Sequence, residues 1–271
     1  MLTAVTLQYK NMTALFISIA VLVIVGYFLF KKREPLVVTT VETTANYAKI
    51  LDEQVEFYHK LDSDGKSRFE KLVVRFLEDT RIEGVGTEIT DLDRMLIASS
   101  AVIPIFGFPD WKYKNLTNVV LYPDTFNSDF QFEGESRNIM GMVGSGYMNG
   151  QMLLSRAALL KGFSSTSGKE NAAIHEFVHL LDKSDGATDG VPENLLPHEY
   201  ATPWLKMMHK EMHDIEAGRS DINPYAITNE AEFLAVAAEY FFEKPDKFEK
   251  MHPELYEMMS RMFAQDPVSG T

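Results

Sequence analysis

The chain has 271 residues, of which 45% are apolar, and its formal net charge is −13. This composition is typical of a globular protein with one sizeable domain or two small ones, and it argues against disorder over most of the length. The negative charge repels polyanions, so we expect no nucleic-acid partner. Because cysteine is absent, disulfides, cysteine nucleophiles and thiolate metal ligands are excluded.

Residues 12–30 form an uncharged apolar run, long enough to cross a bilayer as a helix of roughly 20 residues. A cleaved signal peptide is the alternative, but the end of the run, residues 27–30, offers no small-x-small cleavage site. Basic residues follow at 31–33, so the positive-inside rule places the C-terminal part in the cytoplasm. We therefore expect an N-terminal segment at 1–11, a single transmembrane helix at 12–30 in the inner or plasma membrane, and a tether at 31–45.

The remaining residues, 46–271, predict one α+β domain, mainly helical with a small mixed sheet. Apolar residues recur at helical spacing from Tyr47 to Leu61 and from Ser67 to Ile82, with a turn at Ser63–Gly65 between them. Thr90, followed three residues later by Asp93, resembles a capping box that opens a helix running toward residue 105.

Two short strands are predicted in the middle of the chain, at Val119–Tyr122 and Met152–Leu154. The glycine-rich stretch 126–150 between them has no regular pattern. From Glu170 to the end the pattern is helical, with breaks near 185–197, near 218–224 and at Pro245.

The chemistry is concentrated at the start of this last helical region. His175 and His179 are four residues apart, so on an α-helix both lie on one face and can converge on one metal ion. Glu176 lies about 100° around the helix from His175, where it can reach a metal-bound water without occupying a coordination position. This is the H-E-x-x-H arrangement of zinc peptidases, with Glu176 as general base. The opposite side of the helix is apolar, with Ile174, Phe177, Val178 and Leu181.

The alternative interpretation is a chance pair of surface histidines beside an ordinary glutamate. A second pair, His209 and His213, has the same spacing, but polar residues surround it and we interpret it as a solvated helix face rather than a second metal site. The apolar setting of the first pair distinguishes it, because buried histidines need partners.

A catalytic zinc site needs a third protein ligand. Asp185 is a weak candidate, since no glycine turns the chain after His179, and His198 stands in a segment without fixed geometry. Glu232 and Glu239 are better candidates, because both share one face of an otherwise apolar helix. Glu232 has an alternative role in a helix cap with the asparagine at 229, and Glu239 has one as a buried ion-pair partner. Spacing does not decide between them.

Several blocks in fixed order resemble the Mlc titration factor A family of zinc peptidases, over about residues 66–267. The blocks are His175–Asp182, Asp185-Gly186 with Asp189–Pro192, Pro224–Ala226, Ala231–Phe242 and His252–Tyr256, with fainter likeness at Ile97–Ala101 and Val120–Phe126. The resemblance implies a zincin fold similar to the catalytic domain of anthrax lethal factor, with a mixed sheet over the active-site helix. The chain departs from the family at Arg156, where tryptophan is expected, and across residues 132–147.

The resemblance further implies that His175, His179 and Glu232 bind Zn²⁺ and that Glu176 is the catalytic base. Tyr225 would lie near the metal, where its hydroxyl can bond the tetrahedral oxyanion; a packed tyrosine is the alternative. From its spacing, Asp182 can orient a ligand histidine or contact solvent at the helix end.

Two functions follow as expectations. The first is a membrane-anchored peptidase that acts on a peptide or protein substrate. The second is a regulator that binds a cytoplasmic protein partner, since the family is named for capturing a transcriptional repressor. The presence of Glu176 favours the peptidase, because a purely structural zinc site has no need of it. A membrane protein with a chance motif would bind no stoichiometric zinc.

Overall fold

The computed structural model describes residues 42–270 apart from short gaps at 109, 135–136, 145 and 165–167. Contacts divide the chain into two units, Met1–Thr43 and Thr44–Thr271, and all but the first two residues of the elements described below belong to the second. The segments predicted at 1–11 and 12–30 lie outside the described residues.

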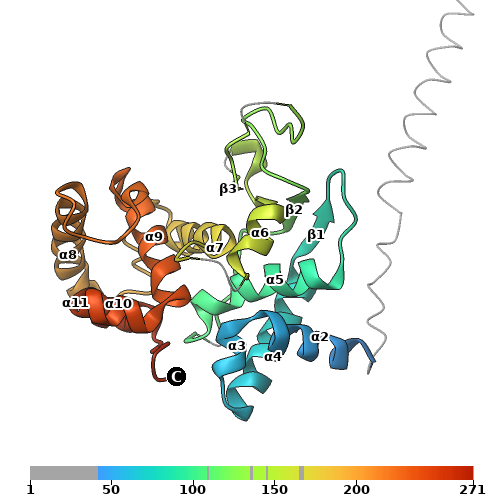
Figure 1. The fold of residues 1–271 in the computed structure, drawn as a ribbon, viewed down its shortest axis with the longest axis horizontal. Helices are drawn as coiled ribbons and strands as arrows, with labels where there is room; N and C mark the ends of the chain where they lie inside the picture. The colour runs from blue at the N-terminus through green and yellow to red at the C-terminus, as the bar shows by residue number, and fades with distance from the viewer. Residues whose placement is uncertain (1–41, 109, 135–136, 145, 165–167, 271) are drawn as a thin grey trace, which may run out of the picture. The chain divides into compact units, whose positions relative to one another are not determined.

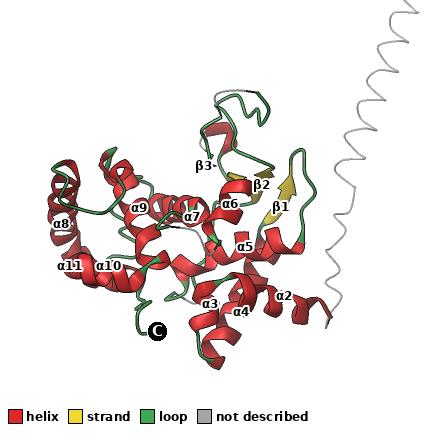
Figure 2. Ribbon diagram, in the orientation of Figure 1, coloured by secondary structure: helices red, strands yellow, loops and turns green. Residues whose placement is uncertain are grey.

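Most of the described chain is helical, with a small sheet near its middle (Figures 1 and 2). Before the sheet is complete, the elements are α2 (Glu42–Gln54), α3 (Glu56–Lys60), α4 (Ser63–Asp79), β1 (Arg81–Gly84), α5 (Asp91–Val102), the 3-10 turn η1 (Ile103–Ile105), β2 (Asn118–Tyr122), β3 (Gly141–Val143), the 3-10 turn η2 (Gly146–Met148) and β4 (Gln151–Ser155). After it come α6 (Arg156–Gly162), α7 (Ala172–Asp182), η3 (Lys183–Asp185), α8 (His198–Glu216), η4 (Pro224–Ile227), α9 (Glu230–Glu243), α10 (Pro245–Met251) and α11 (Pro253–Phe263).

Two helices that precede the second strand, α4 and α5, begin where side chains cap them. The predicted capping box is confirmed, with Thr90 and Asp93 satisfying each other's backbone N–H groups at the start of α5. The turn predicted at Ser63–Gly65 is wrong, because these residues form the first turn of α4. Asp62 accepts a hydrogen bond from the backbone N–H of Gly65 at 2.7 Å, so the polar residues start a helix rather than separate two.

The sheet has four strands in the order β1-β2-β4-β3. Strands β1, β2 and β4 are parallel, and β3 pairs antiparallel to β4 at one edge, with Gly141 opposite Leu154. The two predicted strands are confirmed as β2 and β4. The first two residues of β1 lie at the end of the stretch predicted to be helical, and β3 lies in the stretch without a regular pattern. The mixed sheet and the surrounding helices confirm the α+β class.

Arg156, at the position where the resemblance leads us to expect tryptophan, opens α6 directly after β4. Its Nε and Nη2 atoms donate to the two carboxylate oxygens of Asp93 at 2.9 and 2.7 Å. A bidentate pair of this kind is among the stronger hydrogen-bonded ion pairs, and here it ties α6 to the cap of α5. Arg156 thus has a structural role at the start of α6.

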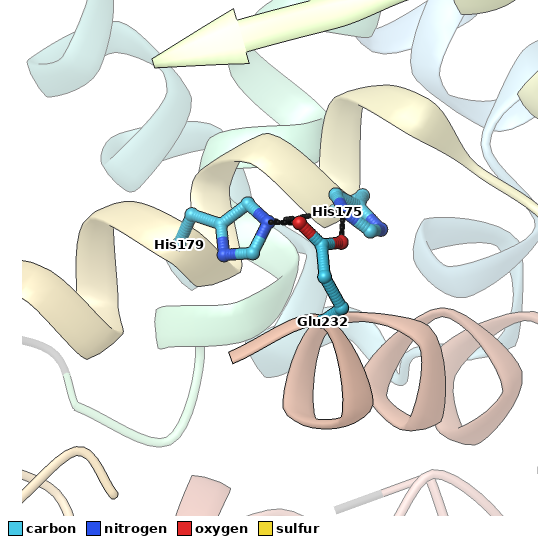
Figure 3. Close-up of side chains that lie close together, drawn as sticks. All are labelled: His175, His179 and Glu232. Carbon is cyan, nitrogen blue, oxygen red and sulfur yellow. Dashed lines mark hydrogen bonds and ion pairs between the residues drawn. The ribbon is translucent and has the colours of Figure 1, made fainter. Parts of the chain in front are cut away.

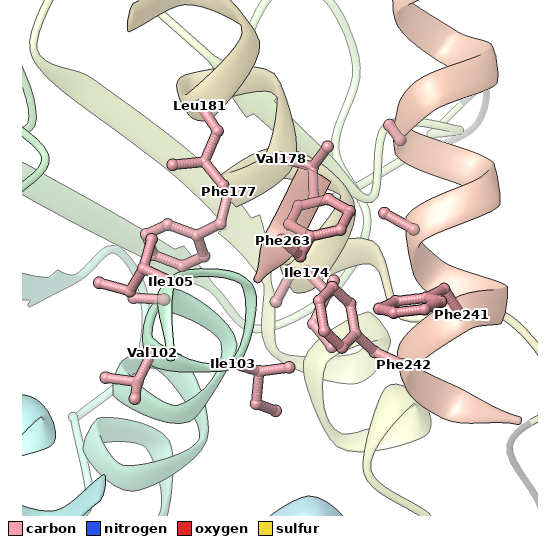
Figure 4. Packing of buried hydrophobic residues seen from close by; sticks show 14 of the residues in the cluster. Val102, Ile103, Ile105, Ile174, Phe177, Val178, Leu181, Phe241, Phe242 and Phe263 are labelled. Atoms are coloured by element: carbon pink, nitrogen blue, oxygen red, sulfur yellow. The ribbon is translucent and has the colours of Figure 1, made fainter. Parts of the chain in front are cut away.

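Helix α7 is held by its apolar side. Ile174, Phe177, Val178 and Leu181 are fully buried, as the sequence predicts, and pack against η1, against α9 and against the end of α11 (Figure 4). Burial of each such side chain stabilises the fold by roughly 1.5–3 kcal/mol. α7 also contacts β3 and makes its most extensive helix contact with α9, so it lies between the sheet and α9 (Figure 1). The opposite side of α7 can therefore carry a site with little freedom to move.

No helix in the described part of the chain is both long and apolar enough to cross a membrane. The longest of those helices, α8, has 19 residues and carries acidic and basic side chains along its length. The expectation of a single-pass membrane location with a cytoplasmic catalytic domain is corrected on this finding, since nothing in the described residues supports it. In addition, α2 begins at Glu42, within the segment expected as a tether.

Candidate metal centre

Three side chains from two helices converge on one point (Figure 3). Nε2 of His175 and Nε2 of His179 lie 3.0 Å apart on α7. The carboxylate of Glu232, on α9, lies 3.0 Å from Nε2 of His175 and 3.6 Å from Nε2 of His179. One ligand atom from each residue falls within 4.8 Å of the other two, and this is the one such group among the described residues.

Capping positions both helices. Asn171 caps α7 by accepting from the backbone N–H of Ile174 at 3.2 Å, and Asn229 caps α9 by accepting from the N–H of Glu232 at 2.9 Å. The alternative proposed for Glu232, a reciprocal cap with Asn229, is thus half realised: the asparagine caps the backbone, while the Glu232 carboxylate turns to the histidines. The cap and the carboxylate have separate tasks.

These distances suit a small divalent cation. Four ligands at 2.0–2.1 Å in a tetrahedron stand about 3.3 Å from one another. The contacts that join the two histidines and the two Glu232 oxygens, at 3.0–3.6 Å, are close to this value. Two nitrogens and one oxygen form a donor set that zinc accepts readily. Burial disfavours the charged form of His175, but its hydrogen bonds to Glu232 and Glu239 outweigh this and raise its pKa to about 10. The surrounding carboxylates therefore favour positive charge at this point, as a metal ion would supply.

Glu239 has a different position from Glu232. Its Oε1 atom lies 2.7 Å from Nδ1 of His175, on the far side of the ring from the three converging atoms. Its other oxygen accepts a hydrogen bond from the backbone N–H of Asn171. Glu239 is therefore the buried partner of His175, which was its alternative role.

The other candidate ligands lie elsewhere. Asp185 accepts hydrogen bonds from the backbone N–H groups of Ala187 and Glu193 and so organises a loop. His198 is exposed at the start of α8. His209, from the second histidine pair, is largely exposed and lies 3.4 Å from Glu230. None of these joins the group formed by the three converging residues.

Glu176 is buried, with 8% of its surface exposed, and lies against β3. A Cβ atom added to Gly141 would come within 2.6 Å of Cγ and 2.9 Å of Oε1 of Glu176, so only glycine lets the edge strand approach this side chain. Burial raises the pKa of Glu176, which makes its carboxylate a stronger base.

Tyr225 lies beside the histidines in η4. Its ring centroid is 6.2 Å from that of His175, and 53% of its surface is exposed, so it is not a packed core tyrosine. Its backbone is fixed by a hydrogen bond from its N–H to Asn223 at 3.0 Å and by the hydroxyl of Thr228, which donates to its carbonyl. The phenol is therefore held near the three ligand atoms while remaining accessible.

Asp182 is fully buried rather than in contact with solvent. One of its oxygens accepts from the backbone N–H of Gly190 at 2.9 Å, and the other has no hydrogen-bond partner among the described residues. Nδ1 of His179 is likewise buried without a partner in this part of the chain. A hydrogen bond between Asp182 and Nδ1 of His179, which would orient this histidine, is therefore not formed, although the Asp182 oxygen and Nδ1 both lack another partner among the described residues.

Two residues close to the site were not expected from the sequence. Gly141 lies in a stretch predicted to be irregular, and no local signal distinguishes it from the neighbouring glycines. Asn171 begins α7 and contacts Glu239. Its position directly before a helical pattern was a usable capping signal.

Comparison with known proteins gives a consistent result. Residues 29–264 match the model of the family described as glucose-regulated metallo-peptidase M90. An uncharacterized protein of Synechocystis sp. is 26% identical over 234 residues, covering 82% of this chain and 85% of the relative. Mlc titration factor A of Klebsiella pneumoniae is 27% identical, covering 77% and 82%. Mlc titration factor A of Escherichia fergusonii is 27% identical, covering 79% and 84%. The expected relationship to the Mlc titration factor A proteins is confirmed, and the chain belongs to the glucose-regulated metallo-peptidase M90 family.

Proposed function

We propose that this protein is a zinc-dependent peptidase in which His175, His179 and Glu232 hold the metal. The convergence of three ligand atoms from residues up to 57 positions apart carries the proposal, since neither helix alone brings them together. The family supports a metallopeptidase, and the mixed sheet beside α7 supports a zincin-like fold. When bound, zinc supplies a Lewis acid and lowers the pKa of a water molecule.

Glu176 acts as the general base. It follows the first ligand directly, is buried beside the metal centre, and has a pKa raised by burial. Its carboxylate accepts a proton from the attacking water and then delivers a proton to the leaving amine. Contact with the edge strand keeps the carboxylate in one place, so little ordering is needed when substrate binds.

Two further residues assist the reaction. The hydroxyl of Tyr225, on a backbone fixed by hydrogen bonds, donates to the oxygen that becomes negatively charged in the tetrahedral intermediate. Glu239 orients the ring of His175 and keeps the proton on Nδ1, which leaves Nε2 free as a ligand.

A second candidate function comes from the printed names of the relatives, which describe titration of Mlc. By analogy, this chain would bind and sequester a protein partner. Such a function needs neither Glu176 nor a strong base in the site. The two functions therefore differ in how they respond to a change at this residue.

Glu176→Gln tests the proposal. We expect it to bind zinc at the same stoichiometry as the wild type, measured by metal analysis, and to lose hydrolysis of a fluorogenic peptide library by at least about 100-fold. Glu249→Gln, an exposed change on α10, is the matched control and should retain full activity. Cleavage by Glu176→Gln at the wild-type rate would show that Glu176 is not the base. A chain that binds zinc and cleaves no peptide would favour the binding function.

A further inference from the structure

A cavity of about 380 Å³ lies at the C-terminal end of α7, the helix that carries the two histidines. Its lining comes from residues 110–116, from the end of β3 and the segment after it, and from the C-terminal end of α7 with η3. Val143 and Gly144 line it on the strand side, and Leu180 and Lys183 line it on the helix side. Strand β3 and helix α7 each connect the cavity to the proposed catalytic residues. Strand β3 begins at the glycine that contacts Glu176, and Leu180 on α7 directly follows the second histidine.

The distance from Gly141, beside Glu176, to the cavity matches the length of a short peptide segment. A strand rises about 3.3 Å per residue, so Gly144, the residue after β3, stands about 10 Å from Gly141 in the direction of the strand. An extended peptide lying beside this edge strand advances by the same amount per residue. A substrate residue two or three positions from the scissile bond therefore reaches the cavity.

The lining is basic, in a chain whose net charge is −13. It contains three lysines, Lys112, Lys114 and Lys183, and one acidic residue, Asp110. Lys112 forms an ion pair with Asp79 at 2.7 Å, but neither of the other two lysines pairs with a carboxylate among the described residues.

Lys183 is the strongest donor on the helix side of the cavity. It is half-buried, and its ammonium group donates to the carbonyl of Gly144 at 3.3 Å. A second donor, the indole N–H of Trp111, is buried without a partner in the described part of the chain. Asn149 and Asn194 contribute further amide groups to the lining. An indole N–H without a partner in the described residues, next to two lysines without a carboxylate partner there, matches an anion with several lone pairs.

We propose that this basic cavity binds a carboxylate of the peptide substrate, two or three residues from the scissile bond. The proposal rests on the peptidase function proposed above and gives it a substrate class: acidic peptides, or peptides whose C-terminus falls at that distance. A carboxylate there gains charge-assisted hydrogen bonds that the corresponding amide does not. The rest of the protein repels negative charge, so the cavity should select peptides by the position of the carboxylate along the chain and not by their overall charge.

The test compares matched peptides on the full chain loaded with zinc. One series carries a single glutamate at each position up to three residues on either side of the cleaved bond, with both ends blocked. A second series has glutamine instead, and a third has no acidic side chain but a free C-terminal carboxylate at varied distance. We expect one glutamate position to raise kcat/KM about tenfold over glutamine, corresponding to one charge-assisted hydrogen bond. Preference in the first or in the third series identifies the source of the carboxylate.

Lys183→Gln should bring the glutamate-to-glutamine ratio close to one. Lys114→Gln, an exposed change in the same lining, should lower the glutamate-to-glutamine ratio. It replaces Lys183→Gln as the test if Lys183→Gln does not fold. Lys206→Gln, exposed on α8, is the control and should leave the ratio unchanged. The proposal is overturned if the wild type shows a glutamate-to-glutamine ratio near one at every position and no preference for a free C-terminal carboxylate at any distance. It is also overturned if the Lys183 and Lys114 substitutions leave the preference of the wild type unchanged.

Binding separates this proposal from the peptidase function. Calorimetry with Glu176→Gln measures peptide affinity without turnover, and it should show the same preference for the carboxylate, lost when Lys183→Gln is added. Preferential binding without cleavage by the wild type would support the cavity and reject the peptidase function. Cleavage without any preference in rate or in binding would reject the cavity and leave the peptidase function standing.

Discussion

Oε1 of Glu239 lies 2.7 Å from Nδ1 of His175, while Oε2 of the same carboxylate accepts a hydrogen bond from the backbone of Asn171. One buried side chain on α9 therefore holds both the first turn of α7 and the ring of its first histidine. A carboxylate on one imidazole nitrogen fixes the tautomer and makes the other nitrogen a better metal ligand. Glu239 thus holds the ring of a proposed metal ligand while lying outside the group of three converging residues.

The two glutamates of α9 should respond differently to substitution. Glu239→Gln retains the shape of the side chain but loses its charge, and we expect zinc affinity to fall about 10–100-fold. Glu232→Ala removes a proposed ligand, so the fall in zinc affinity should be larger. Competition against a chelator of known affinity measures both. If Glu239→Gln lost zinc while Glu232→Ala retained it, Glu239 would be the third ligand.

Gly141→Ala should impair catalysis without removing the metal. A methyl group at this position would lie 2.6 Å from Cγ of Glu176, so either the edge strand or the glutamate must shift. We expect kcat to fall at least about tenfold, because displacement of a positioned general base slows proton transfer. Steady-state kinetics and zinc content measure the two effects separately.

Gly168→Ala is the control for this change, since a methyl group there would meet no atom of the described residues within 4 Å. It should have wild-type kinetics. Normal kcat in Gly141→Ala would mean that the contact between the strand and Glu176 is unimportant for the reaction.

The paired histidines were predictable because their geometry is local. A spacing of four residues places His175 and His179 on one face of any α-helix, whatever it packs against. The third ligand was not predictable from spacing, because Glu232 and Glu239 share a face of α9 and stand about 10 Å apart along it. Only the packing of α9 on α7 decides which carboxylate meets Nε2 and which meets Nδ1.

The fold was predictable where it depends on periodic burial. The helices after Glu170 and the strands β2 and β4 carry clear apolar patterns, whereas β3 has three residues, one of them glycine. Pairing with β4 stabilises β3, so its own sequence has little preference for a strand. The edge strand beside Glu176 is therefore a tertiary feature, and the residue that lets it approach Glu176, Gly141, carried no local signal.

Tyr225→Phe tests the proposed hydroxyl donor. The side chain is half-exposed, so the change should cost little stability. If the phenol stabilises the oxyanion, kcat should fall about 100-fold with KM and zinc content nearly unchanged, because the bond forms only in the transition state. Tyr200→Phe is the control, since it removes a hydroxyl that accepts a hydrogen bond from Arg261 and takes no part in the proposed site. Equal kcat in Tyr225→Phe and the wild type would limit Tyr225 to a packing role.

Glu243 gives the protein a predictable dependence of stability on pH. Burial raises its pKa from 4.5 to about 7, although a hydrogen bond from the side chain of Asn171 at 2.8 Å partly opposes the shift. Between these two pH values the folded protein retains a proton that the unfolded chain releases, so the free energy of unfolding falls as pH rises from about 4.5 through about 7.

Glu243→Gln removes the titrating carboxyl group, and the glutamine side-chain oxygen can still accept the hydrogen bond from Asn171. Its stability relative to the wild type should therefore increase from pH 5 to pH 8, by an amount on the order of 2 kcal/mol. Urea unfolding of both proteins across this range measures the difference, and other titrating groups cancel in the comparison. Glu249→Gln, exposed on α10, should show no such trend. A difference that is constant with pH would mean that Glu243 is ionised in the folded protein and that its burial is offset by other partners.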